Sequence, residues 1–161
     1  MKILAIDPGS RNMAWVMTDG GAVTHAGRTD IFEGKPIESS KVFVRTMQFV
    51  ADMMELIREA DVVIVEQQFV DKKRQLSTTL ITIQTTIQTA AFPKVRLISP
   101  MSVKRYFNME CQNNHQRNKQ LSVLKAQELS PKFAATLEAG TKVDDICDAF
   151  LLNMYFCNRH L

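Results

Sequence analysis

Two acidic side chains stand at the ends of apolar segments, where core packing gives no reason for a charge. Asp7 ends the segment KILAID, and Glu66 ends the segment VVIVE. Short apolar runs of this kind are typical of buried strands. If the two strands are parallel neighbours, their carboxylates meet at one edge of the sheet. Open α/β sheets place their chemistry at the carboxyl ends of strands.

Further acidic residues lie near the C-terminus, on a predicted helix. Asp145 and Asp148 share a helix face at i, i+3, whereas Asp144 makes an i, i+4 pair with Asp148. Spacing alone does not choose between Asp144 and Asp145. Acids near a helix N-terminus also favour the helix dipole, which for this helix alone is the simpler explanation. The three acids nevertheless repel one another, and a bound cation would relieve that repulsion.

Together, Asp7, Glu66, Asp145 and Asp148 predict a site for hard cations. Mg²⁺ and Mn²⁺ prefer carboxylate oxygens, water and substrate phosphate as ligands. Two such ions about 3.5–4 Å apart can stabilise both the attacking and the leaving oxygen in phosphodiester hydrolysis. The predicted chemistry is therefore metal-dependent hydrolysis of a phosphodiester.

Strand and helix signals alternate along the chain and predict how these acids are positioned. Apolar runs predict strands over 2–7, 13–18, 22–31, 62–66 and 95–98, with a hairpin turn at Asp19-Gly20-Gly21. Helical periodicity predicts helices over 43–57, 76–91, 101–107, 116–129 and 142–157. The predicted core face of the first helix is Phe43, Met47, Val50, Met54 and Ile57. This order predicts an α/β fold of the RNase H-like class: a five-stranded mixed sheet, three antiparallel strands then βα units, with helices on both faces.

Composition favours an ordinary globular protein. The 161 residues are 45% hydrophobic, which is enough for one domain over residues 1–161. No apolar stretch is long enough to span a bilayer, and the opening MKILAID is too short for a signal peptide, so we expect a soluble, intracellular (cytoplasmic) protein. The three cysteines and three histidines have no metal-ligand spacing, which argues against a zinc site.

Basic residues are unevenly distributed along the chain. Residues 94–132 contain eight Lys and Arg but only two Glu, and Lys72, Lys73 and Arg74 form a cluster after the second acidic strand. Such a distribution suits a polyanion, most commonly a nucleic acid. Solvated helix faces explain the same charges equally well, so charge alone leaves both interpretations open.

Five motifs, in order along nearly the whole chain, resemble the RuvC-type Holliday junction resolvases. They are IDPGSRNMAW with Asp7, VVIVEQQF with Glu66 and Phe69, ISPMSVKRYF with Lys104, Asn118-Lys119-Gln120, and KVDDICDAFLL with Asp145 and Asp148. Ala14 stands where the bacterial pattern usually has Gly. The Asp144-Asp145 pair is similar to the poxvirus and fungal mitochondrial branches, while DPGSR and EQxF are similar to the bacterial one. The branch therefore stays open, with a viral or phage protein among the alternatives.

The resemblance implies a structure-selective endonuclease that resolves four-way DNA junctions by paired symmetric nicks. Asp7, Glu66, Asp145 and Asp148 would bind two Mg²⁺ ions, for which Mn²⁺ would substitute. The implied DNA contacts are Lys104 and Lys119 to phosphates near the scissile bond, Phe69 to an unpaired base at the junction centre, and Lys72, Lys73 and Arg74 to backbone phosphates. Phe69 could instead be a core residue, although its neighbours are polar.

A homodimer is also implied, because a four-way junction is two-fold symmetric and two active sites can nick opposed strands. The helix over 76–91 and the last helix after residue 149 are weakly polar candidates for the dimer face, although packing within one subunit also explains each. Two alternatives to the junction resolvase stay open. One is an RNase H-like nuclease for structured RNA, similar to the YqgF family, and the other is a non-catalytic protein that binds branched DNA. Cleavage sequence preference stays undetermined.

Overall fold

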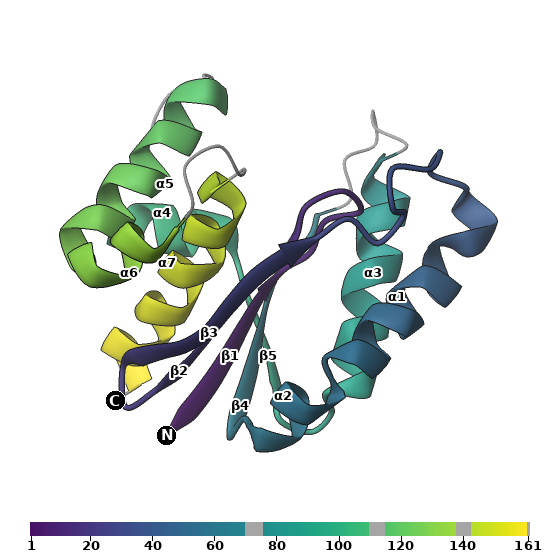
Figure 1. Ribbon diagram of the computed structural model, residues 1–161, viewed down its shortest axis with the longest axis horizontal. Coiled ribbons are helices and arrows are strands. Elements are labelled where there is room, and N and C mark those ends of the chain that lie inside the picture. The colour runs from purple at the N-terminus through teal and green to yellow at the C-terminus, as the bar shows by residue number, and fades with distance from the viewer. Residues whose placement is uncertain (70–75, 110–114, 138–142, 161) are drawn as a thin grey trace.

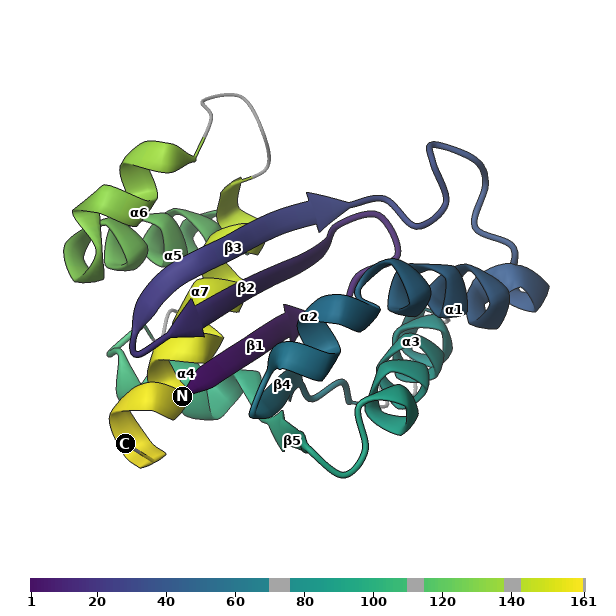
Figure 2. The ribbon, with the colours of Figure 1, turned by 60° about the horizontal axis from the view of Figure 1, so that its bottom comes forward.

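One mixed β-sheet forms the centre of the computed structural model, which describes residues 1–69, 76–109, 115–137 and 143–160. Its strands are β1 (Lys2–Asp7), β2 (Met13–Asp19), β3 (Ala22–Thr29), β4 (Val62–Glu66) and β5 (Val95–Ile98). They lie in the order β3-β2-β1-β4-β5, as Figure 2 shows. The pairs β1–β2 and β2–β3 are antiparallel, whereas β1–β4 and β4–β5 are parallel. The predicted five-stranded mixed sheet is confirmed.

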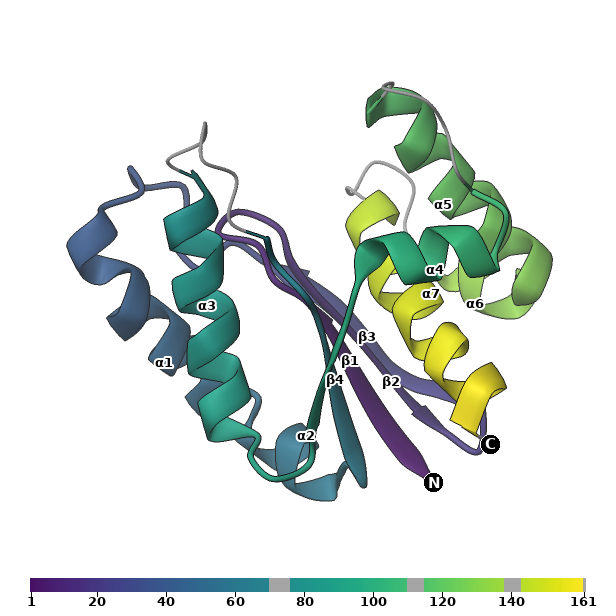
Figure 3. The same cartoon turned by 180° about the vertical axis from the view of Figure 1, so that it is seen from behind.

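Helices cover both faces of the sheet (Figures 1 and 3). On one face lie the short 3-10 helix Ser39–Lys41, α1 (Val42–Asp52), α2 (Met54–Glu59) and α3 (Leu76–Ala90). On the other lie α4 (Pro100–Tyr106), α5 (His115–Leu129), α6 (Pro131–Thr136) and α7 (Val143–His160). Side chains of β1 alternate between the two layers, because Ile3 and Ala5 belong to the core under α7 whereas Leu4 and Ile6 belong to the core under α1 and α3.

The first predicted helix differs from the structure in two ways. It is interrupted at Met53, which separates α1 from α2. The predicted core face is confirmed only in its second half: Val50 and Ile57 are buried and Met54 packs against the core, whereas Phe43 and Met47 are 56% and 42% exposed. The buried side chains of α1 are Val42, Thr46, Phe49 and Val50. Apolar residues occupy more than one side of α1, so periodicity alone could not choose which side meets the sheet.

Helix α6 is absent from the sequence-based prediction. Its start nonetheless has a recognisable signal, since Ser130 is the N-cap and Pro131 the first helical residue. The Ser130 hydroxyl accepts a hydrogen bond from the backbone N–H of Phe133 at 3.4 Å. The same Ser-Pro signal at Ser99-Pro100 begins α4, which corresponds to the helix predicted over 101–107.

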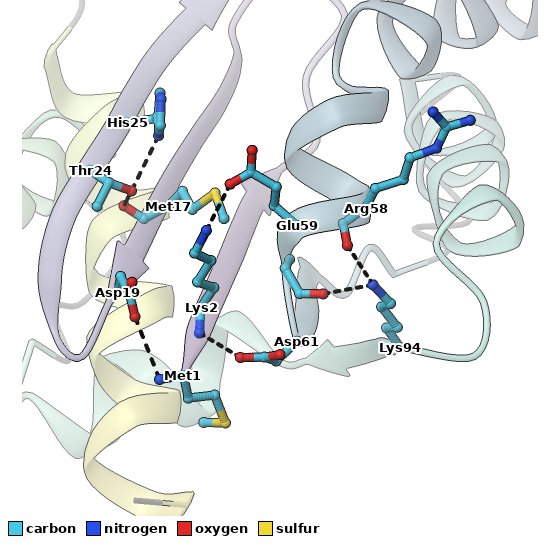
Figure 4. A network of polar contacts seen from close by, with 11 residues as sticks. Met1, Lys2, Met17, Asp19, Thr24, His25, Arg58, Glu59, Asp61 and Lys94 are labelled. Carbon is cyan, nitrogen blue, oxygen red and sulfur yellow. Dashed lines mark hydrogen bonds and ion pairs between the residues drawn. The ribbon is translucent and has the colours of Figure 1, made fainter.

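Polar contacts close the end of the sheet at which β1 begins (Figure 4). The backbone N–H of Lys2 donates to Asp61 at 2.8 Å, and the Lys2 ammonium pairs with Glu59 at 2.9 Å. The Lys94 ammonium donates to the carbonyls of Arg58 and Ala60, both at 2.8 Å. These contacts join β1 to the turn before β4 and to the approach to β5, so they hold the parallel strands in register. The carboxyl ends of β1 and β4 lie at the opposite end of the sheet.

Among the described residues, the structure contains no helix with the length and apolar character needed to cross a bilayer.

Candidate active site

The site begins with the parallel pairing of β1 and β4. Ile6 is paired with Val65, so Asp7 and Glu66 follow at the same level and end their strands side by side. This is the arrangement that the sequence predicted for the two acids. The neighbouring strand β5 is held there as well, because the backbone N–H of Gln67 donates to the Ile98 carbonyl at 2.8 Å.

Helix α7 brings the remaining acids to the same edge. Its side chains Ile146, Cys147 and Phe150 are buried in the core that covers β1 and β2. This packing directs Asp145 and Asp148 into a cavity of about 480 Å³ that Asp7 also lines. The rest of the lining comes from the segment 8–12 and from Leu80, Lys104, Asn118, Lys119 and Ser122. In Figure 3 the two helical layers diverge at this end of the sheet.

The four carboxylates lie within one another's electric field. Burial, followed by the charges of Glu66 and the two α7 aspartates, raises the pKa of Asp7 well above its usual range. Burial, followed by the charge of Asp148, raises the pKa of Glu66 to about 7. Burial also raises the pKa of Asp148 to about 6, although a hydrogen bond from Ser122 lowers it in part. The shared cause is that negative charges are crowded in a partly desolvated place.

The residues present fit a hard cation in their chemistry. Carboxylate oxygens are the ligands that Mg²⁺ prefers, and a bound cation would offset the repulsion that raises these pKa values. The Oδ1 atom of Asn118 adds a buried oxygen in the same cavity that has no hydrogen-bond partner among the described residues. Within the described part of the chain, however, no group of three or more His, Cys, Asp or Glu side chains is placed so that it could hold a metal ion without rearrangement.

Both predicted active-site lysines lie at this cavity. The Lys119 ammonium forms a hydrogen-bonded ion pair with Asp144 and lies 3.8 Å from Oδ1 of Asp145. The hydrogen bond to Asp144 is the main reason that the pKa of Lys119 is raised. The charge of Lys104 lowers the pKa of both Glu66 and Asp148, so Lys104 lies within their field. The two aspartates therefore share the Lys119 cation, and Asp144 is the one that accepts its hydrogen bond.

Two glutamines that the sequence-based prediction did not single out support Glu66. The Gln68 side-chain amide donates to Oε1 of Glu66 at 3.3 Å. The Gln68 backbone N–H donates in turn to Oε1 of Gln84 on α3 at 2.6 Å, and Gln84 is only 8% exposed. A polar residue among the buried positions of an apolar helix was the one signal in the sequence that could have identified Gln84.

Of the remaining predicted DNA contacts, only Phe69 belongs to the described residues, and it does not line the cavity. Phe69 follows Glu66 by three positions and is 56% exposed, so it is not a core residue. Lys72, Lys73 and Arg74 lie outside the described residues.

The raised pKa values lead to a prediction for stability. Glu66 and Asp148 hold protons in the folded state up to pKa values of about 7 and about 6, whereas unfolded carboxyls release them near about pH 4. The folded state then binds more protons, so the free energy of unfolding falls as pH rises through this window. We expect the melting temperature in EDTA to be lower at pH 7.5 than at pH 5, and Mg²⁺ to raise it at pH 7.5.

The control for this experiment is the Glu66→Gln variant, which should show a smaller fall. Asp30, Glu33 and Glu59 have lowered pKa values. Their protonation therefore changes the free energy of unfolding only at a pH below the usual carboxyl pKa of about 4, outside the pH range of this experiment. A melting temperature that rises from pH 5 to pH 7.5 in EDTA would contradict the crowding of these carboxylates.

Comparisons with known proteins place this geometry in context. The family model described as Poxvirus A22 protein matches residues 1–159, whereas no curated protein sequence matches. The fowlpox virus Holliday junction resolvase is 19% identical, with a TM-score of 0.63 and 100% of each chain covered. Thermus thermophilus RuvC in complex with a Holliday junction substrate is 18% identical, with a TM-score of 0.66, covering 98% of this chain and 94% of RuvC. The yeast mitochondrial Holliday junction resolvase Ydc2 is 14% identical, with a TM-score of 0.66, covering 96% of this chain and 76% of Ydc2. At these identities the structural likeness establishes the fold.

Proposed function

The chain belongs to the Poxvirus A22 protein family, and from this premise we propose that it is an endonuclease that resolves four-way DNA junctions by paired symmetric nicks. The observation that carries the proposal is the meeting of Asp7, Glu66, Asp145 and Asp148 at one edge of the sheet, beside two lysines. Three structures with the same fold are described as Holliday junction resolvases or as bound to a Holliday junction. The family supports a viral origin, while the intracellular location and the single-domain organisation stay predictions.

The four carboxylates would hold two Mg²⁺ ions, with Mn²⁺ able to substitute. When bound, such ions neutralise charge on the scissile phosphate and make a bound water more acidic. Lys104 and Lys119 would stabilise the negative charge that develops on the phosphoryl oxygens, because fixed cations beside a reacting phosphate act most strongly where water is excluded. Asp144 holds Lys119 at the cavity, and Gln68 orients Glu66.

DNA would approach over the open end of the cavity. Phe69 is exposed beside Glu66, where an aromatic ring could stack on an unpaired base of the junction. We assign backbone phosphate contacts to Lys72, Lys73 and Arg74, which follow Phe69 in sequence. Junction selectivity would then come from the stacking side chain, and general affinity from the basic residues.

The test is incubation of the purified protein with a synthetic four-way junction, in Mg²⁺ and in EDTA, with a duplex of the same sequence as the control. Paired symmetric nicks in the junction that require Mg²⁺ support the proposal. Tight junction binding without cleavage in Mg²⁺ or Mn²⁺ would favour a non-catalytic binding protein. Faster cleavage of a structured RNA of similar size would favour the RNA nuclease alternative.

Removing the Phe69 ring should weaken junction binding more than duplex binding. Stacking on an aromatic side chain contributes about 1–3 kcal/mol per base, so Phe69→Ala should raise the junction Kd roughly 5- to 150-fold. Phe92→Ala is a matched control, because Phe92 is 78% exposed and lies between α3 and β5 at the other end of the sheet. The measurement is fluorescence anisotropy in EDTA. An equal loss of junction and duplex affinity would refute the stacking role.

For the homodimer, the two candidate faces differ in how far they are covered within one subunit. Helix α7 is largely covered within its own subunit, since Phe150, Leu151 and Leu152 are each 1% exposed, although Tyr155 and Phe156 are half-buried. Helix α3 instead borders a surface cavity of about 580 Å³ together with α1. The cavity is lined by Phe43 and Met47 of α1 and by Ile81, Thr82, Thr85, Thr86, Thr89 and Ala90 of α3. We propose this α1–α3 surface as the face that meets a second copy of the chain.

A charge in the α1–α3 surface should separate the subunits. Thr85 is exposed, so Thr85→Arg should be tolerated in the monomer but should place an unpaired charge in the interface. We expect light scattering after gel filtration to show a dimer for the wild type and a monomer for this variant. Leu124→Arg, at a 59% exposed position on α5 in the other layer, should remain dimeric. A dimeric Thr85→Arg variant would exclude this face.

A further inference from the structure

A buried polar network fastens α7 to the sheet at a distance from the carboxylates. Asn153 lies in the middle of α7 and has no exposed surface. Its side-chain amide donates to the carbonyl of Ile3 on β1 at 2.9 Å and to the carbonyl of Val16 on β2 at 3.3 Å. Its side-chain oxygen accepts from the hydroxyl of Thr18 on β2 at 2.9 Å and from the thiol of Cys157 at 3.4 Å. Both ends of the amide are therefore satisfied.

The surroundings of Asn153 make these hydrogen bonds decisive for the placement of α7. The apolar core between α7 and the sheet combines the large Phe150 ring with the small side chains Ala5, Ala14 and Ala149. Apolar contacts are non-directional, so the small side chains fix the position of the helix along the sheet less tightly than hydrogen bonds do. Hydrogen bonds have defined lengths and angles, and a buried amide that leaves its partners loses them without water as a substitute. Asn153 therefore defines where α7 stands along β1 and β2.

The position of α7 matters because the helix carries two of the four carboxylates. Asp148 is five residues before Asn153, or about 7.5 Å along the axis at the usual helical rise. No Gly or Pro interrupts α7 from Val143 to His160, so a displacement at Asn153 would reach Asp145 and Asp148. Asp7, by contrast, is fixed by the pairing of β1 with β2 and β4.

We propose that Asn153 is a positioning residue, whose buried amide sets the distance between the carboxylates of α7 and those of β1 and β4. This inference rests on the proposed metal-dependent cleavage, which requires the carboxylates of α7 and those of β1 and β4 to bind the same cations. Asn153 touches neither substrate nor cation and acts through the placement of the helix. Misplacing a reacting group by about 1 Å can cost about a hundredfold in rate, and altered support of metal ligands about 10- to 100-fold in metal affinity.

The test separates placement from stability by removing Asn153 together with the Thr18 hydroxyl that donates to it. The double variant leaves no Thr18 hydroxyl without an acceptor, and the Ile3 and Val16 carbonyls lie in strands that are paired on both sides. Thr18→Val/Asn153→Leu should therefore keep a melting temperature near that of the wild type. We expect this variant to bind Mn²⁺, followed by electron paramagnetic resonance, about tenfold or more weakly. Its kcat on the junction should fall by at least as much, while junction binding in EDTA should stay unchanged.

Thr46→Val is the matched control, because it removes a fully buried hydroxyl from α1, on the other face of the sheet. In the wild type this hydroxyl donates to the Val42 carbonyl at 2.7 Å. This control should keep wild-type Mn²⁺ affinity and kcat. The inference is overturned if the double variant binds Mn²⁺ and cuts like the wild type, or if Thr46→Val shows the same losses. If the double variant does not fold, Thr18→Val alone should show a smaller loss of Mn²⁺ affinity, and wild-type affinity there overturns the inference.

Failure of the proposed function is distinguishable from failure of this inference. A wild-type protein that never cuts junctions refutes the function, whereas the comparison of Mn²⁺ affinities between variants still tests the placement of α7.

Discussion

The Asp7→Asn variant should lose junction cleavage and, in metal-free solution at neutral pH, should melt at a higher temperature than the wild type. The loss follows because Asp7 lies where the carboxyl ends of β1 and β4 meet, facing the α7 acids across the cavity. Cations beside the scissile phosphate supply several kcal/mol of charge stabilisation, so the loss of a central ligand should lower kcat by about 10³-fold or more.

The gain in stability has an electrostatic cause. Burial and neighbouring negative charges raise the pKa of Asp7, so keeping Asp7 ionised at pH 7.5 opposes folding. Asn has nearly the same shape and no charge, so the substitution removes this cost. In the wild type, Mg²⁺ should produce a larger rise in melting temperature than in the variant, because a ligand stabilises the state that binds it.

The measurements are single-turnover cleavage of a labelled junction and thermal unfolding at pH 7.5, with and without Mg²⁺. Asp52→Asn, on the exposed surface of α1, is the control and should leave both quantities unchanged. Cleavage by Asp7→Asn within tenfold of the wild type would exclude Asp7 from the catalytic site. A lower melting temperature in EDTA would show that the four carboxylates do not repel one another as proposed.

The second large effect is expected for Lys104. Its charge lowers the pKa of Glu66 and of Asp148, so it helps to keep both ready to bind a cation. Lys104→Met preserves much of the side-chain volume while removing the charge. Loss of one preorganised group that stabilises transition-state charge typically lowers kcat by about 10²–10³-fold, and we expect a fall of this size.

The pH dependence distinguishes this role from simple loss of DNA affinity. Without Lys104, the pKa values of Glu66 and Asp148 should rise, so cation binding and cleavage should begin at a higher pH than in the wild type. The measurement is the acid limb of the kcat profile at a fixed, subsaturating Mg²⁺ concentration. Lys41→Met, at an exposed position beside α1, is the control for lost positive charge. If the acid limb does not shift but junction binding weakens, Lys104 serves only as a phosphate contact.

Several features of the site could be predicted from sequence because their signals are local. Asp7 and Glu66 each end a short apolar run. An acid at the end of a predicted strand can therefore be recognised from the few residues that precede it. The i, i+3 spacing of Asp145 and Asp148 is also a local property, since it depends only on helical geometry. The order of strands and helices then restricted the sheet to the mixed topology that the structure has, with β1 beside β4.

Other features depend on which surfaces meet, and the sequence left these open. Asp144 and Asp145 differ only by the contacts of the folded chain, where Lys119 of α5 donates a hydrogen bond to Asp144 and lies farther from Asp145. Gln68 and Gln84 become neighbours because α3 packs beside the end of β4. No spacing along the chain encodes such contacts.

The sequence by itself thus determined the strands, most of the helices, the carboxylates and the edge of the sheet at which they meet, because hydropathy periods and strand-end positions are properties of short segments. Only the tertiary structure decided which side of α1 is buried and where α7 stands along the sheet. Apolar residues on more than one side of α1 let its periodicity fit more than one orientation, and packing against α3 selected one of them. The position of α7 depends on Asn153 meeting carbonyls of β1 and β2, residues far away in the chain that only the folded sheet brings within hydrogen-bonding distance.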